Sequence, residues 1–104
     1  MTRHTVVRYT VKAGWEERNA ELVRAVYCEL AAAAPPGFRY ATYRLDGGRT
    51  FVHVAANDEE GTTPLTGLAA FRAFQAGLAE RCEQAPVVSA AEQIGVFGAG
   101  LSAR

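Results

Sequence analysis

The side chain best suited to catalytic chemistry is His53, the only histidine outside the N-terminal segment. Histidine is the side chain whose ordinary pKa lies nearest neutrality, so His53 is the candidate general base. The alternative is a structural histidine that is hydrogen-bonded to Thr42 or to polar groups across a subunit interface. The assignment of sheet faces given below favours the structural role.

Six further side chains are candidates for a small-molecule site. Tyrosine packs as a hydrophobe while presenting a hydroxyl, and buried amides need hydrogen-bond partners. The polar candidates are Tyr9 and Tyr43 on expected strands, with Asn19 and Gln75 on expected helices; Trp15 and Phe74 would be apolar walls. Each also fits an ordinary core position. Together they predict a mostly apolar pocket with a few polar groups, which is typical of ligand sites.

The composition describes one domain, residues 1–104, without a basic surface. Hydrophobic residues make up 49% of the chain, and 11 basic residues match 11 acidic ones. Nucleic acids and anionic membranes usually require a basic patch, so neither is expected as a partner. No apolar stretch approaches the roughly 20 residues that span a bilayer. We therefore expect a soluble, cytoplasmic protein.

No motif in the sequence predicts a metal or a cofactor. The glycines at 95–100 precede no expected helix, so they do not form a dinucleotide-binding loop. The acidic run at 58–60 lacks further ligands and is typical of a solvated loop. Cys28 and Cys82 have no neighbouring cysteine or histidine, so we expect two buried, free thiols in a reducing compartment. Any catalysis would have to use ordinary side chains.

Hydrophobic periodicity predicts an α+β domain in the order β-α-β-β-α-β. The expected strands are 5–12, 38–45, 50–56 and 87–97, and the expected helices are 15–34 and 64 to about 82. The turn Asp46-Gly47-Gly48-Arg49 joins the middle strands as a hairpin, and 98–104 is expected to be a flexible tail. A short helix at 89–92 is an alternative within the last strand. The order matches a ferredoxin-like fold, a four-stranded antiparallel sheet with both helices on one face.

Both faces of the expected sheet are apolar, although two helices can cover only one. Pairing across the hairpin places Thr42 opposite His53 and Tyr43 opposite Val52. We assign the more aliphatic face to the helices; it carries Ala41, Tyr43, Leu45, Val52, Val54 and Ala56, with Val7, Tyr9 and Val11 of the first strand. The other face carries Phe38, Tyr40, Thr42, Arg44, Phe51 and His53. Exposed on a monomer, that patch would be unusually large, so we expect a homodimer that buries it.

Four segments carry a resemblance to known proteins. They are Val6–Gly14, Pro36–Tyr40, Phe51–Asp58 and Leu68–Phe74, and they are spread along the core, residues 5–97. In these segments the chain resembles the dimeric α+β-barrel superfamily, and within it the antibiotic biosynthesis monooxygenase-like proteins. The resemblance implies a homodimer whose two sheets form a barrel, with a ligand cavity between sheet and helices in each subunit.

That superfamily includes cofactor-independent oxygenases, haem-degrading enzymes, small isomerases and many proteins of unknown activity. A histidine common in the second helix is absent here, where Leu65 lies at about its position, so haem degradation is not expected. The resemblance implies a cofactor-independent monooxygenase-like protein, or a related isomerase, acting on a small aromatic or enolisable substrate. Tyr9, Tyr43, Asn19 and Gln75 would orient that substrate, and His53 would be the base only if it reaches the cavity. The alternative is a non-catalytic dimer that binds a small ligand or serves in assembly.

Overall fold

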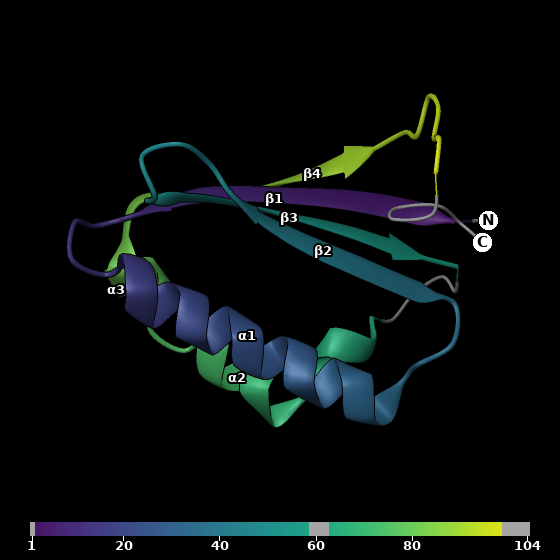
Figure 1. The fold of residues 1–104 in the computed structure, drawn as a ribbon, viewed down its shortest axis with the longest axis horizontal. Coiled ribbons are helices and arrows are strands. Elements are labelled where there is room, and N and C mark those ends of the chain that lie inside the picture. The colour runs from purple at the N-terminus through teal and green to yellow at the C-terminus, as the bar shows by residue number, and fades with distance from the viewer. Residues whose placement is uncertain (1, 59–62, 99–104) are drawn as a thin grey trace.

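A computed structural model describes residues 2–58 and 63–98 of the chain. Within them, strands β1 (Arg3–Val11), β2 (Phe38–Arg44), β3 (Thr50–Asn57) and β4 (Cys82–Ala91) form one antiparallel sheet in the order β2-β3-β1-β4. The helical elements are α1 (Glu16–Ala33), the 3-10 helix η1 (Pro64–Gly67), α2 (Ala69–Gln75) and α3 (Leu78–Arg81). All lie on one face of the sheet (Figure 1). The predicted ferredoxin-like order is confirmed.

Helix α1 and the hairpin match their predicted positions closely. Glu16 and Glu17 occupy the first turn of α1, where the helix dipole favours negative charge. The helix ends before Pro35, which cannot continue it. Across the hairpin, Thr42 pairs with His53 and Tyr43 with Val52, as predicted. No helix among the described residues is both long enough and apolar enough to cross a membrane.

The second helical region is interrupted, and the last strand begins earlier than predicted. Gly77 adopts a φ of 79°, a left-handed conformation that ends the continuous helix expected up to residue 82. Strand β4 then starts at Cys82 and ends at Ala91, so the predicted range 87–97 is wrong at both ends. Pro86 lies where the pairing with β1 shifts, because proline cannot donate to the ladder. Of the predicted flexible tail, residues 99–104 lie outside the described residues.

The predicted assignment of the two sheet faces is wrong for the hairpin. Tyr9 pairs with Phe51, and Val7 pairs with His53, so the aromatic face of the hairpin shares the helix side with Val7, Tyr9 and Val11. Tyr43 and its aliphatic neighbours lie on the open face instead. The aromatic rings fill the wide space beneath the helices, and their polar atoms find partners there. Alternation shows which side chains share a face, but not which face receives the helices.

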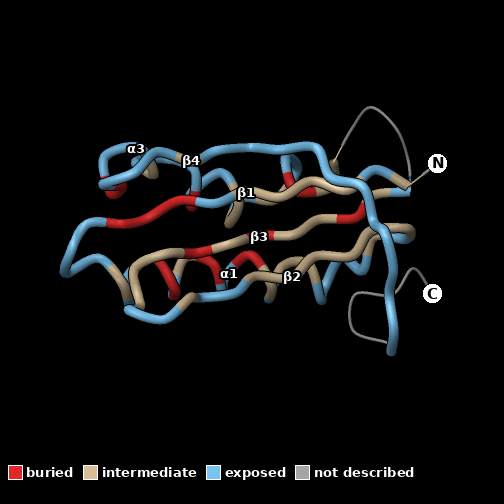
Figure 2. The backbone as a smooth tube through the Cα atoms, turned by 90° about the horizontal axis from the view of Figure 1, so that it is seen from above, coloured by how far each residue is buried: buried red, intermediate tan, exposed pale blue. Residues whose placement is uncertain are grey.

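The core lies between the sheet and the helices, and it is centred on the two middle strands. Tyr9, Val11 and Phe51 from these strands are at most 2% exposed. Seen from above the open face, the buried positions of the sheet lie on β1 and β3, apart from Cys82 at the start of β4 (Figure 2). The Tyr9 and Phe51 rings stack at 5.7 Å between centroids, and Phe74 of α2 packs against Tyr9. Burial of these rings anchors α2 to the sheet.

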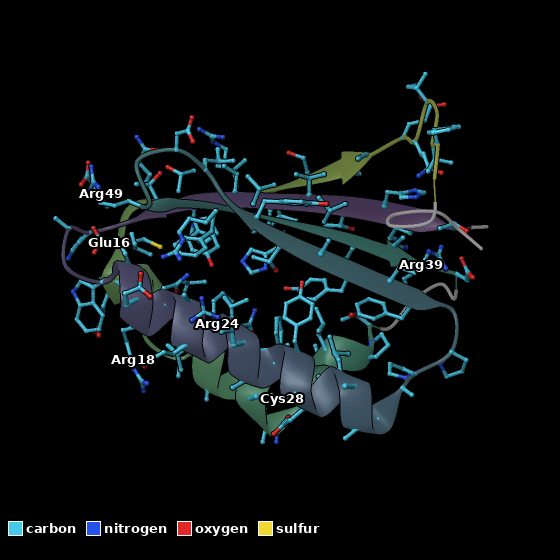
Figure 3. The ribbon with its side chains drawn as sticks, in the orientation of Figure 1. Glu16, Arg18, Arg24, Cys28, Arg39 and Arg49 are labelled. Atoms are coloured by element: carbon cyan, nitrogen blue, oxygen red, sulfur yellow. The ribbon has the colours of Figure 1, made fainter. Side chains whose placement is uncertain are left out.

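The cysteines are free, as predicted, but only one is buried. Cys82 lies in the core at the start of β4, whereas Cys28 is exposed on α1 (Figure 3). The prediction that Cys28 is a buried residue is therefore wrong. Its position on the helix, next to the half-buried Tyr27, belongs to the boundary of the apolar stripe rather than to its centre.

Replacing Phe51 with alanine tests the corrected assignment of faces. Phe51→Ala would leave a cavity beneath the helices, so we expect the free energy of unfolding to fall by about 3–5 kcal/mol. Urea unfolding followed by circular dichroism measures this loss. Arg18→Ala is the control, because Arg18 forms an exposed ion pair with Glu21 and its loss costs at most about 1 kcal/mol. Equal losses for the two variants would show that Phe51 is not a core residue.

Candidate functional site

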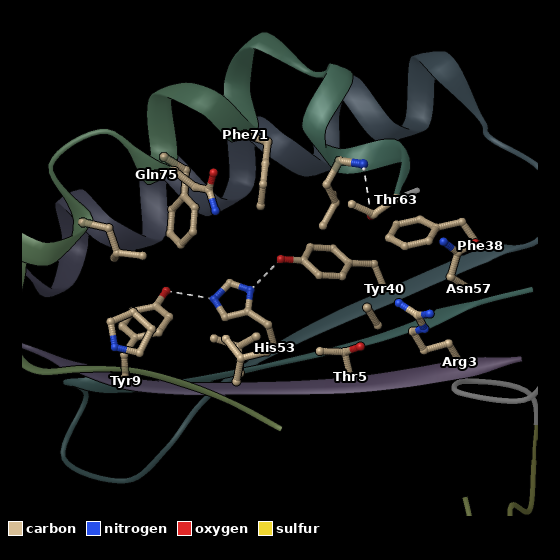
Figure 4. Close-up of a pocket in the computed structure, with 17 residues that line it drawn as sticks. Arg3, Thr5, Tyr9, Phe38, Tyr40, His53, Asn57, Thr63, Phe71 and Gln75 are labelled. Atoms are coloured by element: carbon tan, nitrogen blue, oxygen red, sulfur yellow. Dashed lines mark hydrogen bonds between the residues drawn. The ribbon is translucent and has the colours of Figure 1, made fainter. Parts of the chain in front are cut away.

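A cavity of about 340 Å³ lies between the sheet and the helical segment that contains η1, α2 and α3. The sequence predicted a cavity on this side of the sheet. Its walls are mostly apolar and aromatic. From the sheet it is lined chiefly by Val7, Tyr9, Phe38, Tyr40, His53 and Val88, and from the helical segment by Leu65, Phe71, Phe74, Gln75 and Leu78 (Figure 4). Arg3 and Asn57 add polar atoms at the end nearest the start of β1.

His53 lies in the wall of this cavity, so it reaches the place where a base would be needed. The residue is 4% exposed, and both ring nitrogens are hydrogen-bonded. Nε2 lies 2.8 Å from the Tyr9 hydroxyl, and Nδ1 lies 2.8 Å from the Tyr40 hydroxyl and 3.0 Å from Oγ1 of Thr42. Burial lowers the pKa of His53 to about 4, which keeps the ring neutral near pH 7. Both nitrogens are therefore engaged, and neither is free to contact a ligand directly.

Two residues behind the cavity wall extend the hydrogen-bonded chain away from His53. Nδ2 of the fully buried Asn19 donates to the Tyr9 hydroxyl over 2.9 Å. Arg81 in turn donates to Oδ1 of Asn19 from Nε and Nη2, at 3.3 and 3.2 Å. Arg81 is 5% exposed and also donates to the carbonyl of Phe74 over 2.8 Å. The chain thus links α3, α1, β1 and β3.

Burial also shapes the acid-base behaviour of the two phenols that flank His53. Desolvation raises the pKa of Tyr9 and of Tyr40 well above the ordinary tyrosine value. For Tyr9, the hydrogen bond from Asn19 and the charge of Arg81 partly offset this rise. Both hydroxyls are therefore protonated at neutral pH, and they act as neutral donors or acceptors.

The structure brings some of the predicted binding residues together and separates others. Tyr9, Phe74 and Gln75 line the cavity, and the Gln75 amide extends towards it from α2 (Figure 4). Asn19 lies one layer behind and touches Tyr9. Tyr43 is 47% exposed on the open face of the sheet, because the face assignment was wrong. Trp15 is 43% exposed and borders a separate depression beside α3, so it is not a wall of this cavity.

Sequence reasoning missed Tyr40 and Arg81 as residues of the site. The predicted faces put Tyr40 with His53 on the side away from the helices, so the prediction did not include Tyr40 among the residues that line the cavity. Arg81 follows Phe74 and Leu78 at helical spacing, which places it on the apolar side of the segment. A charged residue on an apolar stripe is the signal that could have identified a buried arginine.

The arrangement suits a flat, mostly apolar molecule with one or two polar atoms. Aromatic rings surround His53: the Tyr9 ring stacks on it at 5.4 Å between centroids, and the tilted Phe74 ring lies 5.5 Å away. An aromatic ligand would extend this set of rings. Among the described residues, no group of three or more His, Cys, Asp or Glu is placed to hold a metal ion.

Comparison with known proteins finds similarity in structure alone. No model of a protein family matches the sequence, and no curated protein is similar to it in sequence. The "putative antibiotic biosynthesis monooxygenase" of Nitrosomonas europaea matches with a TM-score of 0.75 and 16% identity, over 93% of this chain and 94% of that one. NE2512, a protein of unknown function from the same organism, matches with a TM-score of 0.70 and 23% identity, over 96% of this chain and 98% of that one. A dimeric ferredoxin-like protein of unknown function from Jannaschia sp. CCS1 matches with a TM-score of 0.61 and 13% identity, over 89% of this chain and 100% of that one.

The fold and the cavity define a ferredoxin-like α+β protein with a ligand-sized space between its sheet and its helices. Its fold is that of the antibiotic biosynthesis monooxygenase-like proteins, which confirms the resemblance found in the sequence. At identities of 13 to 23% the likeness concerns the fold, since one fold hosts many activities.

The burial of His53 predicts a loss of stability in acid. The folded protein holds the ring neutral down to a pKa of about 4, whereas the unfolded chain takes up a proton near pH 6.5. The stability that the neutral His53 ring contributes is therefore complete above pH 6.5 and is lost as the pH falls towards 4. We expect the free energy of unfolding to drop by about 3 kcal/mol from this source between pH 7 and pH 4. Urea unfolding across that range measures it.

His53→Gln is the variant that isolates this effect, because glutamine keeps polar atoms in the core and does not titrate. Between pH 7 and pH 4, the free energy of unfolding of His53→Gln should fall by about 3 kcal/mol less than that of the native protein. His4→Gln is the control for the other histidine, which lies near the start of β1 and is only partly buried. Identical pH profiles for the native protein and His53→Gln would contradict the buried, neutral state of His53.

Proposed function

We propose that this protein is a cofactor-independent monooxygenase-like enzyme that acts on a small aromatic or enolisable substrate. The observation that carries the proposal is the Tyr40 hydroxyl in the wall of an apolar cavity, hydrogen-bonded over 2.8 Å to the buried His53. The cavity supplies aromatic walls for binding, and Tyr40 supplies a polar atom for a substrate oxygen. The similarity in fold to structures named as monooxygenases supports this choice over other reaction classes.

In the proposed reaction, the substrate carries a CH₂ group that is conjugated with an aromatic ketone, either directly or through an aromatic ring, as in anthrone. The Tyr40 hydroxyl donates to the ketone oxygen and stabilises the enolate that forms when a CH₂ proton leaves to water. The electron-rich enolate then reacts with O₂. The CH₂ group becomes a carbonyl, so that one oxygen atom enters the product and the other leaves as water.

His53 contributes to this reaction through Tyr40 rather than as a free base. Both of its nitrogens are already hydrogen-bonded, and its pKa of about 4 makes it a weak proton acceptor. A donor at Nδ1 would polarise the Tyr40 hydroxyl and strengthen its bond to a developing oxyanion. Tyr9, Gln75 and Phe74 would orient the substrate, since all three line the cavity. Asn19 would act from behind Tyr9.

The second candidate function is binding of a small aromatic ligand without turnover. The apolar walls and the fully engaged His53 favour it, because neither requires chemistry. Oxygen consumption separates the two functions. An enzyme consumes O₂ in proportion to the ketone oxidised, whereas a binding protein takes up the same compounds without consuming O₂.

Tyr40→Phe tests the proposed reaction with anthrone as the substrate. Loss of the hydroxyl removes the donor to the enolate, so we expect kcat/KM for O₂ consumption to fall about a hundredfold. Tyr43→Phe is a matched control, since Tyr43 lies on the same strand but on the open face. Equal activities of Tyr40→Phe and the native protein would contradict the role of Tyr40. No O₂ consumption by the native protein, with anthrone bound, would favour the binding function.

We also propose that two copies of the chain pair through the open face of the sheet. This face carries Val6, Val52 and Val54, together with the more exposed Tyr43 and Val87, at 47% and 63%. Burying a few hundred Å² of apolar surface per subunit contributes on the order of ten kcal/mol before the cost of association. The match to a structure named as dimeric supports this pairing. The interface thus involves the opposite face from the one predicted.

Val54→Asp tests the pairing, because a carboxylate at the centre of the face would have to be buried without a partner. Sedimentation equilibrium at micromolar concentration should give a dimer for the native protein and a monomer for this variant. Arg24→Asp, a larger change of charge at an exposed position of α1, should leave the dimer intact. A monomeric native protein would rule the dimer out.

A further inference from the structure

In the chain of hydrogen bonds behind the cavity, each group donates to the next one in the same direction, and Arg81 sets that direction. A guanidinium group only donates hydrogen bonds, so the Asn19 atom that faces it must be the amide oxygen. The Asn19 amide nitrogen therefore faces Tyr9 and donates to its hydroxyl oxygen. This contact fixes the orientation of an amide that could otherwise rotate.

The same reasoning continues from Tyr9 to His53. The Tyr9 oxygen accepts from Asn19, and its own proton needs an acceptor because Tyr9 is 1% exposed. Nε2 of His53, at 2.8 Å, is the acceptor that the contacts of Tyr9 provide. If Nε2 carried a proton instead, Tyr9 would accept twice and its buried proton would lose this partner, which is unfavourable in a core that excludes water. The arrangement of lower energy leaves Nε2 unprotonated.

Because the ring is neutral, its single proton then lies on Nδ1 and points towards β2. It donates to the Tyr40 hydroxyl at 2.8 Å, with Thr42 a second acceptor at 3.0 Å. The Tyr40 oxygen thus accepts from His53, and its own proton is available to the cavity that Tyr40 lines. The Tyr27 hydroxyl contacts Oγ1 of Thr42 over 2.8 Å and completes the chain on α1.

Arg81 is held firmly enough to serve as the start of this chain. It donates to the carbonyls of Phe74 and Ala76 at the end of α2, and its guanidinium lies 5.5 Å from the centre of the Phe74 ring. Among the described residues, the ion pairs involve other arginines, so these carbonyls and Asn19 are its polar partners. A buried arginine with several neutral acceptors keeps its position and its direction of donation.

We propose that Arg81 and Asn19 are positioning residues that hold His53 as its Nδ1-H tautomer, so that Tyr40 is a hydrogen-bond donor to the cavity. The site then selects ligands that present an acceptor oxygen, such as an aromatic ketone or an oxyanion, over ligands that only donate. The part that concerns the ligand rests on the proposed function of the cavity. The tautomer of His53 follows from the contacts and from the neutral state of the buried ring, and it does not depend on the proposed function.

The tautomer can be measured directly by ¹⁵N-¹H NMR at pH 7, where the chemical shifts of Nδ1 and Nε2 tell a protonated nitrogen from a bare one. In the native protein we expect a protonated Nδ1 and a bare Nε2. The opposite pattern, or a charged ring, would overturn the proposal. This measurement needs no variant and no substrate.

Asn19→Asp reverses the direction of donation in these hydrogen bonds without a large change in the shape of the side chain. An aspartate carboxylate only accepts, so Tyr9 would donate to it and accept from Nε2 of His53, and the Nε2-H tautomer should replace Nδ1-H. Thr10→Val is the control, because Thr10 is buried and hydrogen-bonded to Thr50 outside this chain. An unchanged tautomer in folded Asn19→Asp would overturn the role of Asn19. If that variant does not fold, the native spectrum still decides the tautomer.

The ligand preference is tested with 1-tetralone, an aromatic ketone, and tetralin, the hydrocarbon of similar shape. We expect Asn19→Asp to lower the ratio of ketone affinity to hydrocarbon affinity about tenfold, measured by calorimetric titration, while Thr10→Val leaves it unchanged. An unchanged ratio in Asn19→Asp would overturn the ligand preference. A native protein with the Nδ1-H tautomer but without O₂ consumption would contradict the proposed reaction and support the positioning role.

Discussion

The structure depends on the burial of one imidazole ring within an aromatic layer. A neutral histidine in such a place must have both nitrogens hydrogen-bonded, because an unpaired polar atom in a core costs more than a bond contributes. His53 finds its partners on β1 and β2, the two neighbours of its own strand. Its requirement therefore couples the register of three strands, since a slip of one residue would move the ring to the open face.

The same requirement connects the sheet to the helices. Tyr9 bonds to Asn19 on α1, and Thr42 bonds to Tyr27 on the same helix, so α1 is tied to the sheet at two places along its length. Arg81 then joins α1 to the end of α2 and the start of β4. Apolar contacts supply most of the burial energy, but they are tolerant of small shifts. The directional bonds select one arrangement of the layers from the several that hydrophobic burial alone would permit.

These particular interactions explain which features could be predicted from the sequence. Period-two alternation and the two glycines of the turn were sufficient for the hairpin register, because both signals are local. The choice of face is not local: the aliphatic set around Val54 and the aromatic set around His53 are both apolar enough to be buried. The aromatic set faces the helices because Tyr27 and Asn19 offer partners there, and those residues lie on a different element. The break at Gly77 was missed because one glycine within an apolar helical pattern often remains helical.

The polar chain also bears on whether the cavity performs chemistry or only binds. A core network that satisfied every donor and acceptor internally would present an inert wall. The bridge that His53 forms between two tyrosines does not do this by itself, because two hydroxyl protons and one imidazole proton are available for only two bridging bonds. One proton is left over, and Arg81 and Asn19 assign it to Tyr40 by orienting the chain from the buried end. The residue nearest the ligand space thereby acquires a donor whose direction is set by groups that a ligand never touches, which is the preorganisation that stabilising a developing oxyanion requires.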